Sequence, residues 1–332
     1  MTATLDAPAP EAGTAPPRRR VRRRTPDPNR EQVRGFDKFW VSVFLAPFLL
    51  LYLGFTLWPL VATVYYSFFD WDGIGPIDHF VGTGNYGSIL NDKLFWLAVA
   101  NTLIFAVLNT AIKLPLSLLM AIVLTRKWLK GSKLFRTVFF APLIIPVAMA
   151  GLIFTYLLNP SNGALNALLL DLHIVDHPVD VFAGRWSALL VIVLVSIWQI
   201  FGQYMIYWVA ALQNVPEEVY EAADIDGASE WRKATLITLP MIKPVAVVIL
   251  LLALVNAMHV FGLVVTLTGG GPGTSTYVVS YFIYQEAFGS VPFSYGYASA
   301  AALLFSVIAF VLVTSQGVFV RRAQKLRKEY GV

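Results

Sequence analysis

Six long apolar stretches without acidic residues are the feature that most constrains the fold of this chain. Each has roughly the 20 residues or more that an α-helix needs to cross the hydrocarbon core of a membrane. The stretches are residues 39–69, 94–124, 137–158, 186–212, 244–267 and 297–320. Only the second contains a basic residue, Lys113. A membrane β-barrel would instead show short segments of alternating polarity, so we predict an all-α integral membrane protein with six transmembrane helices.

Composition supports the same class of protein. Hydrophobic residues make up 57% of the 332 residues and charged residues only 14%, whereas charged residues make up about 25% of an ordinary soluble protein. The chain contains no cysteine, which excludes a disulfide framework and any metal site built on thiolates.

The Lys and Arg residues indicate which loops face the cytoplasm. They gather in the N-terminal tail, in alternate loops and in the C-terminal tail, whereas the intervening loops hold at most one each. The basic segments are residues 1–38, 125–136, 213–243 and 321–332. Basic residues beside a span stay on the cytoplasmic side, so we predict that both termini and the loop at 213–243 are cytoplasmic.

The first 38 residues differ from the rest of the chain. They are rich in Pro, Ala and Arg and include RRRVRRR at 18–24, which predicts a disordered tail that contacts anionic lipid rather than nucleic acid. The long apolar stretch that follows does not fit a cleaved signal peptide. The predicted organisation is a basic tail at 1–38, a six-helix transmembrane domain at 39–320 with a cytoplasmic loop at 214–243, and a basic cytoplasmic tail at 321–332.

The loop at 214–243 carries the start and stop signals of two helices. Glu217 and its acidic neighbour favour the positive N-terminus of a first helix. Gly227 lies where a positive φ commonly ends a helix, and Ser229 can cap a second helix, which we expect Pro240 to end. The loop is therefore predicted to form a helix–turn–helix beneath the membrane.

A longer pattern runs through the same loop. Residues 221–228 are EAADIDGA, and the sequence ITLP follows at 237–240. The chain also contains LTGGGP at 267–272, after the fifth apolar stretch, and the pair Asn-Thr at 101–102 in the second. From about residue 40 onward, the chain resembles the permease subunits of ABC importers, in particular the sugar-uptake group that includes maltose and glycerol-3-phosphate permeases.

The resemblance implies a role for the loop. In that family the loop is the EAA loop, and residues 217–227 would be the coupling helix that inserts into a groove on a separate ATPase. The short side chains of Ala222 and Ala223 would let that protein approach closely. The residues that the resemblance assigns to ATPase coupling are Glu217, Glu221, Ala222, Ala223, Asp226, Gly227 and Pro240.

The sequence departs from the family pattern at two places. Ala234 stands where an aromatic residue is usual, which is expected to affect docking of the ATPase. Phe261-Gly262 stands where Phe-Asp is frequent, which is expected to affect the substrate path.

The resemblance also implies the fold and the partners. It implies an ABC type I importer permease fold in the bacterial inner membrane, and a chain that is a transporter subunit rather than an enzyme. The partners would be a second permease subunit, two ABC ATPase subunits that bind Mg-ATP, and an extracytoplasmic solute-binding protein. We expect no cofactor bound directly to this chain and no metal site.

Motifs in the sequence agree with an external energy source. The GGGPGTS segment at 269–275 lacks the lysine that a phosphate-binding loop places before Ser or Thr. Proton-driven carriers place acidic or histidine relays inside their spans, and the six stretches contain no acidic residue. We therefore expect a partner to supply the energy for transport.

Two polar stripes are candidates for the substrate path. The fourth apolar stretch holds Gln199, Gln203 and Tyr207 at four-residue spacing with Tyr204 beside them, and the fifth holds Asn256, His259 and Thr266. Amides, hydroxyls and aromatic rings suit a neutral sugar, although the same groups often join helices by hydrogen bonds. Both interpretations stay open at this stage.

The favoured function is import of a sugar, in particular an oligosaccharide. The alternatives are import of another polar solute, such as a glycerol-3-phosphate-like compound, a polyol or a polyamine. Clusters of acidic residues inside the spans would favour a polyamine as the solute, and the six stretches contain no acidic residue. Three roles are open for Lys113: it lines a water-filled cavity, it pairs with a group on another helix, or it attracts an anionic solute. The sequence does not decide among them and does not identify the solute.

Overall fold

The computed structural model describes residues 28–126, 129–289 and 291–329, with side chains described from residue 39 to 315 within those ranges. Within the described residues the regular structure is helical, apart from one isolated bridge between Phe69 and Phe80. The elements in chain order are α1 (Pro28–Tyr52), η1 (Leu53–Leu57), α2 (Trp58–Tyr66), α3 (Gly84–Asn91), α4 (Lys93–Leu124), α5 (Ser132–Phe140), η2 (Ala141–Ile144), α6 (Val147–Leu157), α7 (Ala164–Asp171), α8 (Arg185–Leu212), α9 (Glu217–Ile225), α10 (Glu230–Arg232), η3 (Lys233–Thr238), α11 (Leu239–Met258), α12 (Gly262–Leu267), α13 (Val279–Tyr284), η4 (Gln285–Gly289) and α14 (Tyr295–Glu329).

The prediction of a helical membrane protein is confirmed. Among the described residues, five helical segments are long and apolar enough to cross a membrane, and a bent pair raises the number to six if it counts as one span. The five segments are Phe39–Tyr66, Lys93–Leu124, Arg185–Leu212, Glu230–Met258 and Tyr295–Ser315.

The third predicted span, 137–158, is wrong as a continuous helix. The segments Ser132–Ile144 and Val147–Leu157 meet at an angle of 95°. Pro146 has φ −56° and ψ 139° at the start of α6, and Ile145 before it is also extended. A proline disfavours helical geometry in the preceding residue, so the chain turns at this point although its apolar composition continues.

The fifth predicted span, 244–267, is also divided, and Pro240 does not end a helix. The helix that begins at α10 continues through the wide turn η3 into α11, with Pro240 near the start of α11. A single π turn inside an α-helix changes the hydrogen-bond register, which allows the chain to continue past the proline. α11 then ends at Met258, and α12 forms separately.

The helices extend beyond the predicted tail boundaries. α1 begins at Pro28, where proline at the first helical position costs no hydrogen bond, and α14 continues to Glu329. The disordered tail was expected to reach residue 38; residues 1–27, which include the RRRVRRR run, lie outside the described residues.

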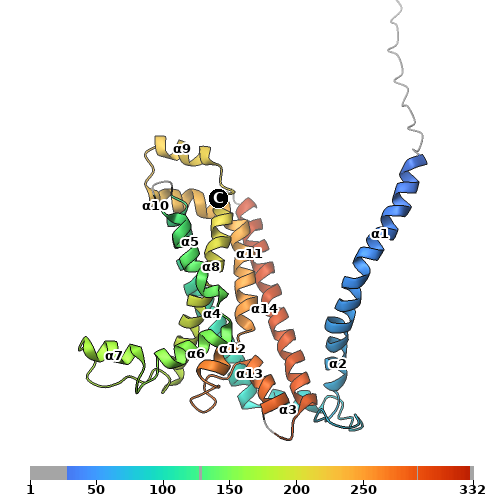
Figure 1. The fold of residues 1–332 in the computed structure, drawn as a ribbon. Coiled ribbons are helices and arrows are strands. Elements are labelled where there is room, and N and C mark those ends of the chain that lie inside the picture. The colour runs from blue at the N-terminus through green and yellow to red at the C-terminus, as the bar shows by residue number, and fades with distance from the viewer. Residues whose placement is uncertain (1–27, 127–128, 290, 330–332) are drawn as a thin grey trace, which may run out of the picture. The chain divides into compact units, whose positions relative to one another are not determined.

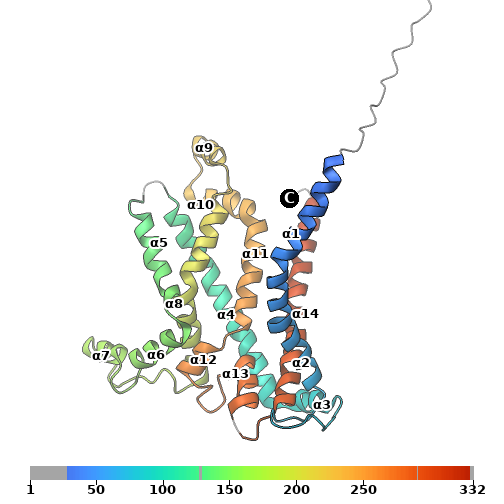
Figure 2. The ribbon, with the colours of Figure 1, turned by 45° about the vertical axis from the view of Figure 1, so that its right-hand side comes forward.

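The chain divides into two compact units, Met1–Pro59 and Leu60–Val332. In the second unit α4 packs between α8 and α11, and α14 packs against α11 and α13. Helix α9 lies at one end of this bundle, whereas α12 and α13 lie toward the other end (Figure 1, Figure 2). Two clusters of buried side chains fill the bundle, one around Phe95, Phe105 and Phe282 and the other around Tyr204, Met205 and Trp208.

Candidate functional site

Helix α9 and its final turn follow from the loop sequence. The helix begins directly after Pro216 with two glutamates in its first turn. It ends at Ile225, and Gly227 forms the turn that follows with a φ of +71°. The amide of Ala228 donates to the carbonyl of Ala223 at 2.9 Å, which is the six-to-one bond of a glycine-terminated helix. The predicted helix end at Gly227 is therefore confirmed.

One face of α9 packs against its own chain. Ala223 is buried, with 6% of its surface exposed. The hydroxyl of Tyr220 lies 2.8 Å from that of Thr238 in η3. The small side chain of Ala223 thus allows α9 to approach the rest of this chain, which differs from the expected contact with another protein.

The other face of α9 is open. Glu221, Ala222 and Asp226 are exposed, and Ile225 exposes 88% of its surface. This face is therefore free to contact another protein. The role of these residues in ATPase coupling stays a prediction.

A cavity of about 350 Å³ lies between α4, α8, α11 and α12. Its polar lining comes from amide, hydroxyl and imidazole groups, and none of the described lining residues is acidic. The polar lining residues are Asn109, Ser196, Gln199, Gln203, Tyr204, Asn256 and His259. Aromatic surface comes from Phe105, Tyr204 and Phe261.

Five of the seven substrate-path candidates line this cavity: Gln199, Gln203, Tyr204, Asn256 and His259. These groups also join elements, since Gln199 donates to the carbonyl of Ile145 at 2.9 Å and Asn256 to the Tyr204 hydroxyl at 3.2 Å. The hydrogen bonds between elements are therefore observed, and the use of these residues in the substrate path stays a prediction.

Two candidates lie elsewhere. Tyr207 accepts a hydrogen bond of 2.7 Å from Gln203 and lines a second cavity of about 250 Å³ between α8 and α11. Thr266 lies on α12, where its hydroxyl donates to the carbonyl of Gly262 and its own carbonyl accepts from Thr155 on α6.

Lys113 lies beside two cavity-lining residues, Asn109 and Tyr204, and is fully buried. Its ammonium donates to Asn109 at 2.9 Å and lies 4.0 Å from the centre of the Tyr204 ring. Asn109 in turn donates to Ser196 on α8 at 3.1 Å. Lys113 therefore bonds one cavity-lining residue, Asn109, and stacks on another, Tyr204. Because Tyr204 lies on α8, this contact is the pairing across helices that was one of the roles considered for Lys113.

Sequence reasoning did not select Asn109 or Ser196. Asn109 lies four residues before Lys113, so the two share a helical face, and that spacing was a usable signal. Ser196 lies three residues before Gln199, also on one face. The hydrogen bond between Asn109 and Ser196 joins two helices, and no spacing within one stretch identifies it.

The glycine-rich segment at 267–279 forms a loop held by the second span. Asn101 donates to the carbonyls of Ser275 and Tyr277 at 2.9 and 2.8 Å. Its oxygen accepts from Arg185 at 2.8 Å, and the Thr102 hydroxyl accepts from the amide of Val279 at 3.0 Å. The pair at 101–102 thus anchors this loop to α4.

Gly262 explains one departure from the family pattern. A Cβ at Gly262 would overlap the side chain of Val147, and a Cβ at Gly151 would overlap that of Thr266. Helices α6 and α12 therefore approach closely through small residues, as packed membrane helices commonly do. A larger residue at Gly262 would separate the two helices beside the cavity.

The fold and these two regions define a class of protein: a polytopic helical permease with a solute-sized cavity in its bundle and an exposed helix–turn–helix at one end. Residues 113–325 match the family described as "Binding-protein-dependent transport system inner membrane component". The chain belongs to this family, and it is an ABC importer permease subunit of the inner membrane rather than an enzyme.

Relatives and a solved structure agree with the family over most of the chain. The probable ABC transporter permease protein YurN of Bacillus subtilis is 34% identical over 87% of this chain and 98% of its own length. The lactose transport system permease protein LacF of Rhizobium radiobacter is 32% identical over 81% of this chain and 90% of its own. A subunit in the crystal structure of a bacterial alginate ABC transporter, in complex with an alginate pentasaccharide-bound periplasmic protein, aligns with TM-score 0.76 and 25% identity over 87% of this chain and 96% of its own.

Proposed function

We propose that this chain is one of two permease subunits of an importer for an oligosaccharide. An extracytoplasmic binding protein would deliver the sugar, and two ATPase subunits would supply the energy. The observation that carries the choice of substrate is the cavity, whose described lining offers hydrogen-bonding groups and aromatic rings without a carboxylate.

The size of the cavity supports a sugar. Its volume of about 350 Å³ falls at the low end of the range of about 300–1,000 Å³ for small-molecule sites. A second permease subunit would enlarge the site across the shared interface, so one or two sugar rings would contact each subunit. LacF is named for lactose, and the aligned structure holds a protein bound to an alginate pentasaccharide.

The open face of α9 supports the partner assignment. We place α9 and both termini in the cytoplasm, because the basic loops predict that orientation. Glu221, Ile225 and Asp226 would then face the ATPase subunits. The glycine-rich loop at 267–279 would lie toward the extracytoplasmic binding protein, away from Mg-ATP.

Lys113 favours an anionic solute as the second candidate. A buried ammonium bonded to the cavity-lining Asn109 raises the electrostatic potential of the site, and this would favour an acidic sugar or a glycerol-3-phosphate-like compound. The same charge opposes a polyamine.

The direct test is reconstitution. The tagged chain is co-expressed with the products of neighbouring genes, purified in mild detergent and placed in proteoliposomes. ATP hydrolysis and uptake are then measured with neutral oligosaccharides, oligouronates, glycerol-3-phosphate and spermidine.

We expect co-purification of an ATPase, a second permease and a binding protein, and stimulation of ATP hydrolysis by one neutral oligosaccharide. Stimulation by an oligouronate or by glycerol-3-phosphate alone would replace the first candidate with the second. Uptake by the chain alone without ATP would contradict both.

A further inference from the structure

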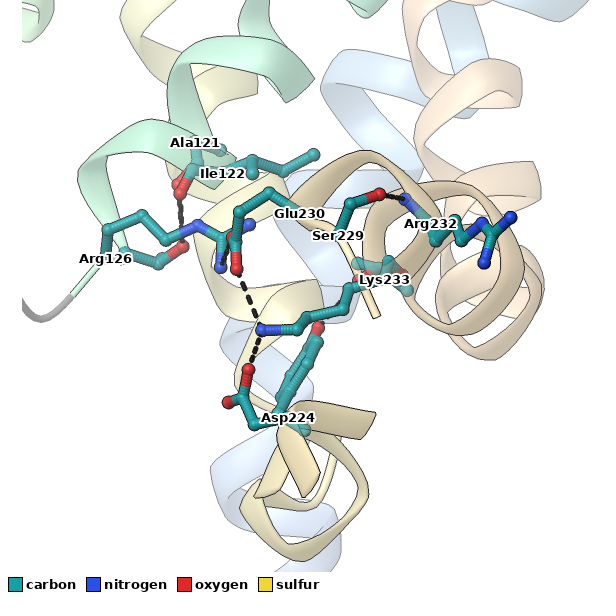
Figure 3. Close-up of polar contacts among 11 residues, drawn as sticks. Ala121, Ile122, Arg126, Asp224, Ser229, Glu230, Arg232 and Lys233 are labelled. Atoms are coloured by element: carbon teal, nitrogen blue, oxygen red, sulfur yellow. Dashed lines mark hydrogen bonds and ion pairs between the residues drawn. The ribbon is translucent and has the colours of Figure 1, made fainter. Parts of the chain in front are cut away.

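An ion-pair chain of four residues joins α9 to the transmembrane helices (Figure 3). The guanidinium of Arg126, two residues beyond the end of α4, pairs with the carboxylate of Glu230. Lys233 donates to Glu230 at 2.8 Å and pairs on its other side with Asp224 of α9. The charges alternate along the chain, so each cation is attracted to the carboxylate beside it.

Lys233 is the central member of the ion-pair chain. Its side chain is only 6% exposed, whereas those of Asp224 and Glu230 are 62% and 61% exposed. A buried ammonium is tolerated only when its charge is paired, and in Figure 3 the Lys233 side chain lies between the two carboxylates. Exposed ion pairs contribute little on their own, so the buried Lys233 is the member whose loss should matter most.

The ion-pair chain connects the elements that carry the cavity. Arg126 follows α4, which contributes Asn109 to the cavity lining, and Lys233 opens the turn that leads into α11, which contributes Asn256. Besides these charges, α9 has the Tyr220–Thr238 hydrogen bond, the buried Ala223 and the packing of the Tyr220 ring on the cluster around Tyr204, Met205 and Trp208, which includes Ala121 and Leu124 of α4. That packing is apolar and non-directional, so among these links to α4 the ion-pair chain is the one that fixes α9 through paired charges.

We propose that Lys233 is a positioning residue that makes α9 move together with α4 and α11. When the ATPase displaces α9, the ion-pair chain transmits that displacement to the two helices beside the solute cavity. Without the Lys233 charge, α9 can tilt on its remaining contacts while α4 stays in place. The inference rests on the proposed function, since it assigns a transmission route between ATPase and solute sites.

The test uses the complete transporter in proteoliposomes and compares three variants. Lys233→Met keeps most of the side-chain volume and removes the charge, whereas Lys233→Arg keeps the charge. Lys243→Met is the matched control, because Lys243 belongs to α11 and takes part in none of the ion pairs found among the described residues. The measured quantity is the amount of solute imported per ATP hydrolysed.

We expect Lys233→Met to retain its ATPase subunits and its ATP hydrolysis while import per ATP falls about tenfold. Lys233→Arg should recover most of that loss, and Lys243→Met should match the unmodified transporter. Import per ATP in Lys233→Met equal to that of Lys243→Met would overturn the inference. The inference would also be overturned if Lys233→Met lost its ATPase subunits and the other two variants kept theirs, because Lys233 would then be needed for assembly of the complex.

A distance measurement separates transmission from assembly. The chain has no cysteine, so spin labels at Val123→Cys in α4 and at the exposed Glu218→Cys in α9 would be the only ones on this subunit. We expect one narrow distance distribution with Lys243→Met and a broadened one with Lys233→Met; equal distributions would refute the proposed link. If the unmodified transporter shows no ATP-dependent import, the proposed function fails, and that result is distinct from a failure confined to Lys233→Met.

Discussion

Replacing Gly227 tests whether the turn after α9 contacts a partner. Gly227 has a φ of +71°, and no heavy atom lies within 4 Å of the position of an added Cβ. A substitution therefore meets no steric obstacle inside this chain, and its intrinsic cost comes from the backbone alone. That cost is about 1–2 kcal/mol for an ordinary L-residue in the left-handed region, and Asn and Asp tolerate this region best.

The cost is small beside the stability of a folded domain, which is about 5–15 kcal/mol. Gly227→Asp should therefore insert and fold, and its transport defect should come from the Cβ and the charge that it adds to the turn that the proposed function places against the ATPase. Gly227→Asn is the matched control, because it has nearly the same shape without the charge. We expect transport to be abolished by Gly227→Asp and reduced less by Gly227→Asn.

The assays are membrane yield, ATPase co-purification and solute uptake. Normal uptake by Gly227→Asp would refute the assignment of this turn to coupling. Equal failure of both variants to insert would show that the turn is needed for folding, and the energy argument from the open space around Gly227 would be wrong.

Three further predictions concern separate parts of the molecule. Glu221→Lys reverses a charge on the open face of α9 and should reduce ATPase co-purification about tenfold; an unchanged yield would place the contact elsewhere. Gln203→Ala removes an amide from the cavity lining, where one hydrogen bond to the solute would contribute about 0.5–1.5 kcal/mol, and should raise the KM for uptake without changing basal ATP hydrolysis; equal loss of both would make Gln203 structural. Asn101→Ala leaves the carbonyls of Ser275 and Tyr277 without their donor, at about 1–3 kcal/mol each, and should lower the thermal unfolding temperature followed by tryptophan fluorescence; an unchanged temperature would mean that the loop holds without this bond.

The sequence predicted most helices because a membrane span needs length and apolar composition, both of which are local properties. It did not predict the bend at Pro146, since apolar residues continue on both sides of the proline. The end of α11 at Met258 was missed for the same reason. Pro240 was misplaced because a π turn, which depends on the packing of η3, lets the helix continue.

The site was predictable where one helix carries the signal. The stripe of Gln199 and Gln203 on α8 was found from spacing, and both line the cavity. Lys113 was noticed because a charge inside a span is costly, but its contact with Tyr204 crosses between helices. Lys233 was recognised only as a basic loop residue, because its pairing with Asp224 depends on the turn at Gly227.

The most direct test of the account is ATP-driven uptake in proteoliposomes that contain this permease with its partner subunits, assayed with and without the binding protein. The account predicts that an oligosaccharide accumulates only when ATP is present on the α9 side and the binding protein on the opposite side. Accumulation by this chain alone, or with ATP absent, would contradict the claim that it is the permease subunit of an ATP-driven importer.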